Sequence, residues 1–130
     1  VETRILLELK TVRLAAMRRT KDDLIQLKEA LQAYKFKVEN GEDAVQEDLL
    51  FHLAIAKASG NSTMNTFMLI ITPEIITNFE KYHVCDSDLS QKGIEEHQAI
   101  YDAIFKQDVK LAKQTMKEHF GVLYQYCYNI

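Results

Sequence analysis

The sequence predicts an all-α domain built as an antiparallel bundle of about six helices. Apolar residues recur at spacings of three and four through most of the chain, which is the period of a helix with one buried face. One proline and four glycines leave few places where regular structure would break. Strict alternation of apolar and polar residues, the sign of a strand, never persists. With 47% hydrophobic content, residues 1–130 are expected to form one domain with its own core.

The first two helices are separated by a capping signal at Thr20. Before this signal, one helical face carries Ile5, Leu9, Val12 and Ala16. Thr20 is a suitable N-cap, and Asp22 and Asp23 follow in the first turn, where the helix dipole favours carboxylates. The second helix is expected to end at Asn40-Gly41, because glycine readily adopts the left-handed conformation of a C-terminal cap.

The third helix is expected over residues 43–59, and Gly60-Asn61 should close it. A fourth helix begins near Ser62. Pro73 should kink or restart this fourth helix, because proline lacks the backbone N–H that a helix interior needs.

The last two helices are expected over residues 88–106 and 108–128, after a polar connection at residues 83–90. Asp108 is a suitable N-cap for the final helix. A turn near Gln107 would make these two helices an antiparallel hairpin.

The composition excludes several classes of protein. The net charge is −3 and the longest basic cluster is Met17-Arg18-Arg19, so the chain by itself is poorly suited to gripping nucleic-acid phosphates. Two cysteines do not make a disulfide framework, and a reducing cytoplasm is expected. No apolar run approaches the roughly 18–20 residues of a membrane span. The chain opens in helical register without a methionine, which suggests a piece of a longer protein.

Four residues interrupt the apolar faces of these helices in a related way. Asp48 and His52 are four residues apart and share one face of the third helix. His97 and His119 each lie on an apolar stripe of the last two helices. If those helices form a hairpin, both imidazoles lie about 15–17 Å from the turn and can point to one place. A metal held by Asp48, His52, His97 and His119 in the bundle interior is therefore predicted.

Three imidazoles and one carboxylate suit a divalent transition metal. Zinc fits this donor set best, and nickel, manganese or iron are alternatives. Four ligands leave positions on a five- or six-coordinate metal for water or a ligand carboxylate. An isolated ionised aspartate inside an apolar bundle is costly, and a cation would offset that cost.

Each candidate ligand also has an ordinary structural explanation. A lone histidine on an apolar face is usually a hydrogen-bonded core residue, and helices produce Asp-x-x-x-His pairs by chance. Glu95, Glu96 and Glu118 flank the cluster in sequence but are expected to face away from it. His83 and Cys85 form another potential ligand pair, for which surface or capping roles are expected.

The same residues carry a family resemblance. The matching segments are Asp48-Leu49-Leu50-Phe51-His52, Gly60-Asn61, residues 97–104, residues 108–112 and Met116-Lys117-Glu118-His119. In this order they resemble the FCD domain, the C-terminal effector-binding part of the FadR subfamily of GntR-type transcription regulators. The resemblance spans nearly the whole chain.

The resemblance implies a protein with a winged helix-turn-helix domain before Val1, which binds operator DNA as a homodimer. A small organic acid bound in the C-terminal domain would then alter the affinity for DNA, and the chain would not be an enzyme. Arg4 lies where many relatives carry an arginine that faces the cavity, and Asn61 matches a recurrent family position. Both are candidate effector contacts. A surface role for Arg4 and a helix cap for Asn61 are the alternatives.

Two other functions are compatible with the sequence. A helical-bundle metalloenzyme could use an open metal position to activate water or oxygen, although no general base besides the ligands is evident. A structural oligomerisation module would keep the histidines in its core. Apolar surface for such a dimer could come from the first or the fourth helix.

Overall fold

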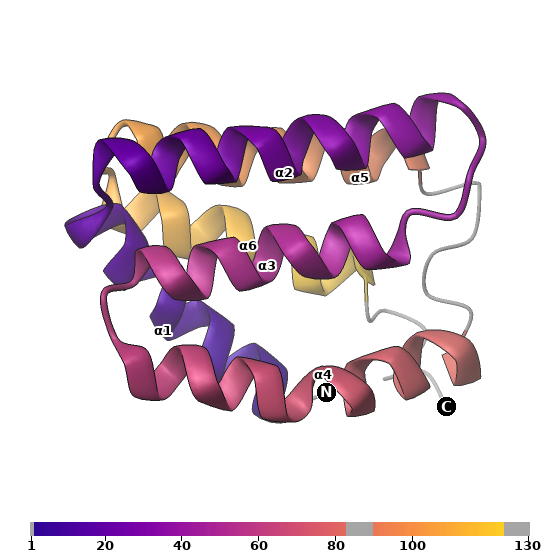
Figure 1. Cartoon of the computed structure of the whole chain (residues 1–130), viewed down its shortest axis with the longest axis horizontal. Helices are drawn as coiled ribbons and strands as arrows, with labels where there is room; N and C mark the ends of the chain where they lie inside the picture. Colours follow the sequence, from indigo (N-terminus) through magenta and orange to yellow (C-terminus); the bar gives the residue numbers. More distant parts are fainter. Residues whose placement is uncertain (1, 83–89, 124–130) are drawn as a thin grey trace.

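The structure, a computed structural model, describes residues 2–82 and 90–123 and contains only α-helices over them, which confirms the predicted fold class (Figure 1). The six helices are α1 (Glu2–Arg18), α2 (Lys21–Glu39), α3 (Val45–Ala58), α4 (Ser62–Tyr82), α5 (Ser90–Phe105) and α6 (Val109–Leu123). None of them combines the length and hydropathy needed to cross a membrane.

The helices stack so that the middle of the bundle is enclosed on all sides. Figure 1 shows α2 and α5 along one edge, α1 and α4 along the opposite edge, and α3 and α6 between them. The apolar core includes Val12, Leu27, Phe51, Ile55, Met68, Ile100, Ile104 and Met116. Residues from α3, α5 and α6 therefore meet in a region that water does not reach.

Local capping explains where several helices begin and end. Thr20 and Asp23 form a capping box, in which each side chain accepts a hydrogen bond from the other residue's backbone N–H. Gly41 follows α2 with a φ of 69°, as a C-terminal cap requires. The Asp108 carboxylate accepts from the N–H of Leu111 at 3.0 Å, which confirms it as the cap of α6.

Pro73 was expected to kink or restart α4, and the helix continues through it without a restart. Proline removes the N–H that would bond to the carbonyl of Leu69, but Leu69 is 54% exposed, so water can take that place. One turn of weakened hydrogen bonding at a solvent-facing position leaves the helix continuous.

The buried face of α1 is rotated from the predicted one. Val12 and Ala16 are buried, whereas Ile5 and Leu9 are only partly buried. The fully buried side chains of this helix include those of Arg4 and Glu8. A charged pair thus points into the bundle, where an apolar stripe was expected.

Candidate metal centre

The four predicted ligands meet at one point inside the bundle. Helix α3 supplies Asp48 and His52, α5 supplies His97 and α6 supplies His119, and all four are buried. One potential ligand atom from each lies within 4.8 Å of the others. The centroids of the His97 and His119 rings are 4.9 Å apart, as a hairpin with both histidines at one level requires. The predicted clustering is confirmed.

Each histidine has its Nδ1 atom engaged on the outer side of this cluster. Nδ1 of His97 donates to the backbone carbonyl of Gly93 at 2.6 Å, and Nδ1 of His119 donates to Oε1 of Glu96 at 2.7 Å. Nδ1 of His52 donates to Oε1 of Glu8. Because the carbonyl of Gly93 and the ionised carboxylate of Glu8 only accept, these contacts hold the proton on Nδ1 of His97 and His52 and turn Nε2 toward the centre. Burial raises the pKa of Glu96 to about 7, so above that pH its carboxylate holds Nδ1 of His119 in the same way.

The Nε2 atoms have the surroundings expected of metal ligands. Nε2 of His52 and Nε2 of His119 are buried and have no hydrogen-bond partner. Oδ1 of Asp48 lies 2.6 Å from Nε2 of His97 and 3.2 Å from Nε2 of His52. Orphaned buried nitrogens around a carboxylate are costly unless a cation binds them. The donor set and these orphaned atoms therefore fit a divalent metal.

The buried charges around this cluster compensate one another in the metal-free chain. Burial opposes ionisation of Asp48, but the two facing histidines hold its pKa well below the ordinary value. Burial would lower the pKa of His52, yet the carboxylates of Glu8 and Asp48 outweigh it and raise that pKa to about 9. Burial and two neighbouring histidines keep the pKa of His119 well below its ordinary value. In the metal-free chain a proton on His52 thus balances the negative charge.

Two outer residues were not predicted. Glu96 was expected to face away, but its carboxylate contacts His119, because His119 lies on the neighbouring helix of the hairpin. Glu95 and Glu118 are exposed, as expected. Glu8 was missed altogether, although it is one turn from Arg4 and one turn from Val12, and that spacing would have placed a carboxylate on the buried face.

The two predicted effector contacts lie in different surroundings. Arg4 is 2% exposed, pairs with Glu8 at 2.5 Å and stacks over the ring of Phe120 at 5.3 Å. Asn61 accepts from the backbone N–H of Met64 at 3.1 Å, which makes it the N-cap of α4. His83 and Cys85 lie outside the described residues.

Comparison with known proteins agrees with this architecture. The chain is 34% identical over 131 residues to the "Putative L-lactate dehydrogenase operon regulatory protein" of Escherichia coli (strain K12), covering 95% of this chain and 48% of that protein. It is 32% identical over 123 residues to the HTH-type transcriptional regulator LutR of Bacillus subtilis (strain 168), covering 92% and 56%. Among solved structures, E. coli McbR/YncC shares the fold with a TM-score of 0.70 at 24% identity, over 95% of this chain and 62% of that one.

The family assignment rests on the match to a whole domain. The chain spans about half the length of the curated relatives that it matches. Those relatives are named as regulators rather than as enzymes. The model of the FCD domain matches residues 1–122. The chain therefore belongs to the FCD domain family.

Proposed function

We propose that this domain is the ligand-sensing and dimerisation part of a transcription regulator and that it binds a small organic acid at a divalent metal. The observation that carries the proposal is the convergence of three Nε2 atoms and one carboxylate of Asp48, with every Nδ1 held from outside. Such outer contacts are characteristic of histidines that ligate metals.

Asp48, His52, His97 and His119 would hold the metal. Zinc suits three imidazoles and a carboxylate best, and nickel, manganese or iron can also take these ligands. The metal, when bound, supplies a Lewis acid that accepts a carboxylate oxygen of the effector. The protein's own contribution is to hold the four ligands in a region closed to bulk water.

The effector that we favour is a 2-hydroxy carboxylate. One relative is named for an L-lactate dehydrogenase operon. A 2-hydroxy acid offers a carboxylate and a neighbouring hydroxyl as two oxygen donors. Arg4 is the proposed partner of the carboxylate, because a guanidinium has five donors and can serve Glu8 and a ligand together. Asn61 is the second proposed contact.

Binding to operator DNA is assigned to a winged helix-turn-helix domain before Val1. One relative is named as an HTH-type regulator, and this chain covers 56% of its length. The net charge of −3 also argues against DNA binding by this domain alone. A cytoplasmic location follows from such a role.

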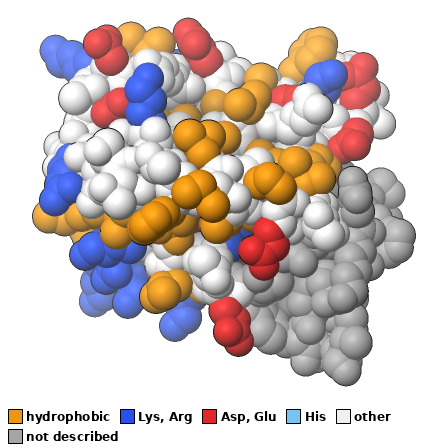
Figure 2. Space-filling view, turned by 60° about the horizontal axis from the view of Figure 1, so that its bottom comes forward, with side chains coloured by type: hydrophobic (Ala, Val, Ile, Leu, Met, Phe, Trp, Pro, Cys, Tyr) orange, Lys and Arg blue, Asp and Glu red, His pale blue; other side chains and the backbone are white. Residues whose placement is uncertain are grey.

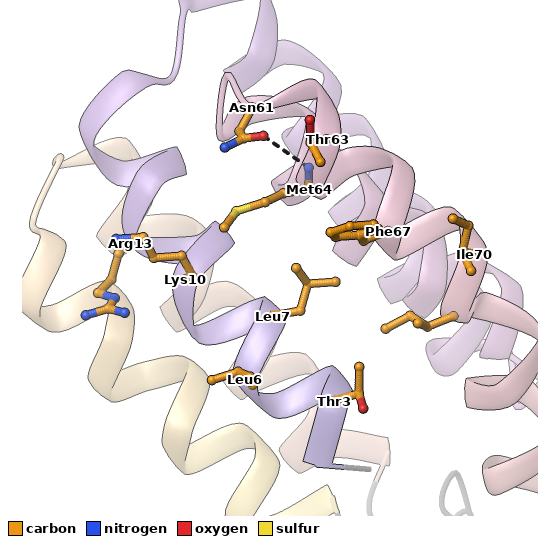
Figure 3. Close-up of a pocket in the computed structure, with 11 residues that line it drawn as sticks. Thr3, Leu6, Leu7, Lys10, Arg13, Asn61, Thr63, Met64, Phe67 and Ile70 are labelled. Carbon is orange, nitrogen blue, oxygen red and sulfur yellow. Dashed lines mark hydrogen bonds between the residues drawn. The ribbon is translucent and has the colours of Figure 1, made fainter.

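The proposed homodimer uses the face formed by α1 and α4. Figure 2 shows hydrophobic side chains gathered in a band across this face. They include Leu6, Phe67 and Ile70, which are 77%, 50% and 64% exposed. A groove of about 710 Å³ lies between the two helices, with Leu6 and Leu7 on one side and Met64 and Phe67 on the other (Figure 3). Contiguous exposed apolar surface of this kind marks an interface, and a second copy would cover it symmetrically.

Calorimetric titration of metal-free and zinc-loaded protein with L-lactate tests the sensor directly. Propionate is the matched control ligand, because it lacks only the hydroxyl. We expect L-lactate to bind the zinc-loaded chain at least about tenfold more tightly than propionate, a difference of about 1.4 kcal/mol, because only L-lactate offers the metal a second oxygen. The metal-free chain should not discriminate between them.

Protein variants separate the parts of this proposal. His52→Ala with His119→Ala should abolish zinc uptake, measured by plasma mass spectrometry. Asn61→Asp keeps a capping oxygen, so a loss of L-lactate affinity at unchanged thermal stability would identify a ligand contact. Equal operator affinity of the full-length regulator with and without saturating effector would contradict the sensor role.

A further inference from the structure

Helix α1 supplies no ligand, yet its innermost polar residues adjoin the metal centre. Arg4 and Glu8 are one helical turn apart, and they are 2% and 0% exposed. Glu8 uses both carboxylate oxygens: Oε2 accepts from Nε of Arg4, and Oε1 accepts from Nδ1 of His52. A buried carboxylate is tolerated only when such partners compensate it. The Arg4–Glu8 pair therefore places a carboxylate against Nδ1 of His52.

We infer that Glu8, held by Arg4, is a positioning residue that orients His52 and sets the affinity of the centre for its metal. This inference rests on the metal binding proposed above. A carboxylate at Nδ1 retains the proton on that nitrogen and leaves the lone pair of Nε2 for the metal. It also fixes the rotation of the ring and makes the imidazole a stronger donor.

The outer partner of His52 differs from those of the other two ligands. His97 has a neutral backbone carbonyl from its own helix, which a side-chain substitution does not remove. His119 has Glu96, whose side chain is 14% exposed, so water can replace that carboxylate. The side chains of Glu8 and His52 are both 0% exposed, and no water can substitute. Loss of the outer partner should thus affect His52 most.

Two variants and a matched control test this role. Removing Glu8 alone would leave Arg4 buried without its carboxylate. Both residues are therefore replaced together, by Arg4→Met and Glu8→Leu. A buried ion pair usually tolerates replacement by apolar side chains of similar volume. Glu8→Gln retains an acceptor oxygen but no charge. Glu2→Gln changes an exposed carboxylate on the same helix and serves as the control.

Zinc affinity is measured by competition with a chelating dye, and the visible spectrum of the cobalt(II) form reports the ligand geometry. We expect the zinc affinity to fall about 100-fold in the paired variant and about tenfold in Glu8→Gln. The cobalt bands should shift in the paired variant and remain unchanged in Glu2→Gln. If Glu8 had only a structural role, the paired variant would have a lower thermal midpoint, but its folded form would keep the zinc affinity and the cobalt spectrum of the parent.

The outcomes distinguish this inference from the proposed function. If the parent chain binds zinc and the paired variant binds it equally well with the same cobalt spectrum, the positioning role is overturned and the metal site stands. If the paired variant does not fold, Glu8→Gln decides, and parental zinc affinity there overturns the inference. If the parent binds no metal, the proposed metal site fails and the role of Glu8 fails with it.

Discussion

At the scale of single residues, Gly93 shows how closely the neighbours of the centre are packed. The ring of Tyr34 stacks on the ring of His97 with centroids 4.1 Å apart. A Cβ atom at position 93 would lie 2.4 Å from the hydroxyl oxygen of Tyr34 and 3.6 Å from its Cζ. The glycine therefore allows an aromatic ring to cover His97, a proposed metal ligand, and an added methyl group would clash with the hydroxyl of that ring.

Gly93→Ala should destabilise the chain by about 1–3 kcal/mol through overpacking, even though alanine favours helix. Chemical denaturation measures the change. Gly121→Ala is the matched control, because a Cβ at this helical position meets nothing within 4 Å, and it should stabilise by about 0.5–1 kcal/mol. Tyr34→Phe in the Gly93→Ala background should restore stability. Full stability of Gly93→Ala without that second change would contradict the close approach.

Two histidines of the centre should give the metal-free chain opposite responses to pH. The pKa of His52 is raised from 6.5 to about 9, so its contribution to the free energy of unfolding is complete below pH 6.5 and is lost as the pH rises through about 9. The pKa of His119 is lowered from 6.5, so its contribution is present above that pH and is lost as the pH falls. The two histidine contributions together should therefore be greatest near pH 6.5, the ordinary pKa of both side chains.

Urea denaturation of the metal-free chain across these pH values tests the prediction. The zinc-loaded chain should show no decline near pH 9, because Nε2 of His52 then carries no proton. Stability of the metal-free chain that stays constant between about pH 7 and about pH 9 would show that His52 is neutral.

At the scale of helices and their connections, backbone conformation rather than side-chain contact determines which residue is favoured at two turns. Gly41 and Gln107 follow α2 and α5 with φ angles of 69° and 57°. The left-handed region suits glycine and costs other residues roughly 1 kcal/mol. Gly41 meets that requirement, whereas Gln107 does not.

Gln107→Gly should stabilise the chain by about 0.5–1 kcal/mol, because it removes the strain at the turn between α5 and α6. Gly41→Ala is the converse change and should destabilise by about 1 kcal/mol. A Cβ at position 41 meets nothing within 4 Å, so steric contact does not complicate that result. Thermal unfolding of both variants measures the difference, and a destabilising effect of Gln107→Gly would show that the side chain contributes more than the strain costs.

At the scale of the whole molecule, the apolar face of α1 and α4 should control association. Leu6→Glu places a charge on the most exposed large hydrophobic residue of this face, and the protein should become monomeric in sedimentation velocity. Phe36→Glu is the control, because Phe36 is 64% exposed but lies on α2. A dimer that persists in Leu6→Glu and dissociates in Phe36→Glu would show that the interface includes α2 and not the face formed by α1 and α4.

Most of this architecture was predictable because its signals are local. Thr20, Asn61 and Asp108 cap the helices that follow them, and the four proposed ligands lie on apolar stripes where a polar side chain is conspicuous. Helix α1 was harder, because charged residues occur all around it and a shift of one position turns a helix by about 100°. Glu8 consequently did not stand out as a buried residue. Pro73 does not restart α4, because its effect depends on whether Leu69 meets solvent, which the sequence does not reveal.

The distribution of contacts around the centre has a consequence for local opening of the molecule. A bound metal would cross-link α3, α5 and α6 directly, and α1 through Glu8, whereas none of the described outer contacts comes from α4. Amide hydrogen exchange should therefore slow on the cross-linked helices when metal binds, while α4 keeps its own opening rate. The four cross-linked helices would then behave as a rigid unit, and α4, whose residues line the groove beside α1, would adjust independently.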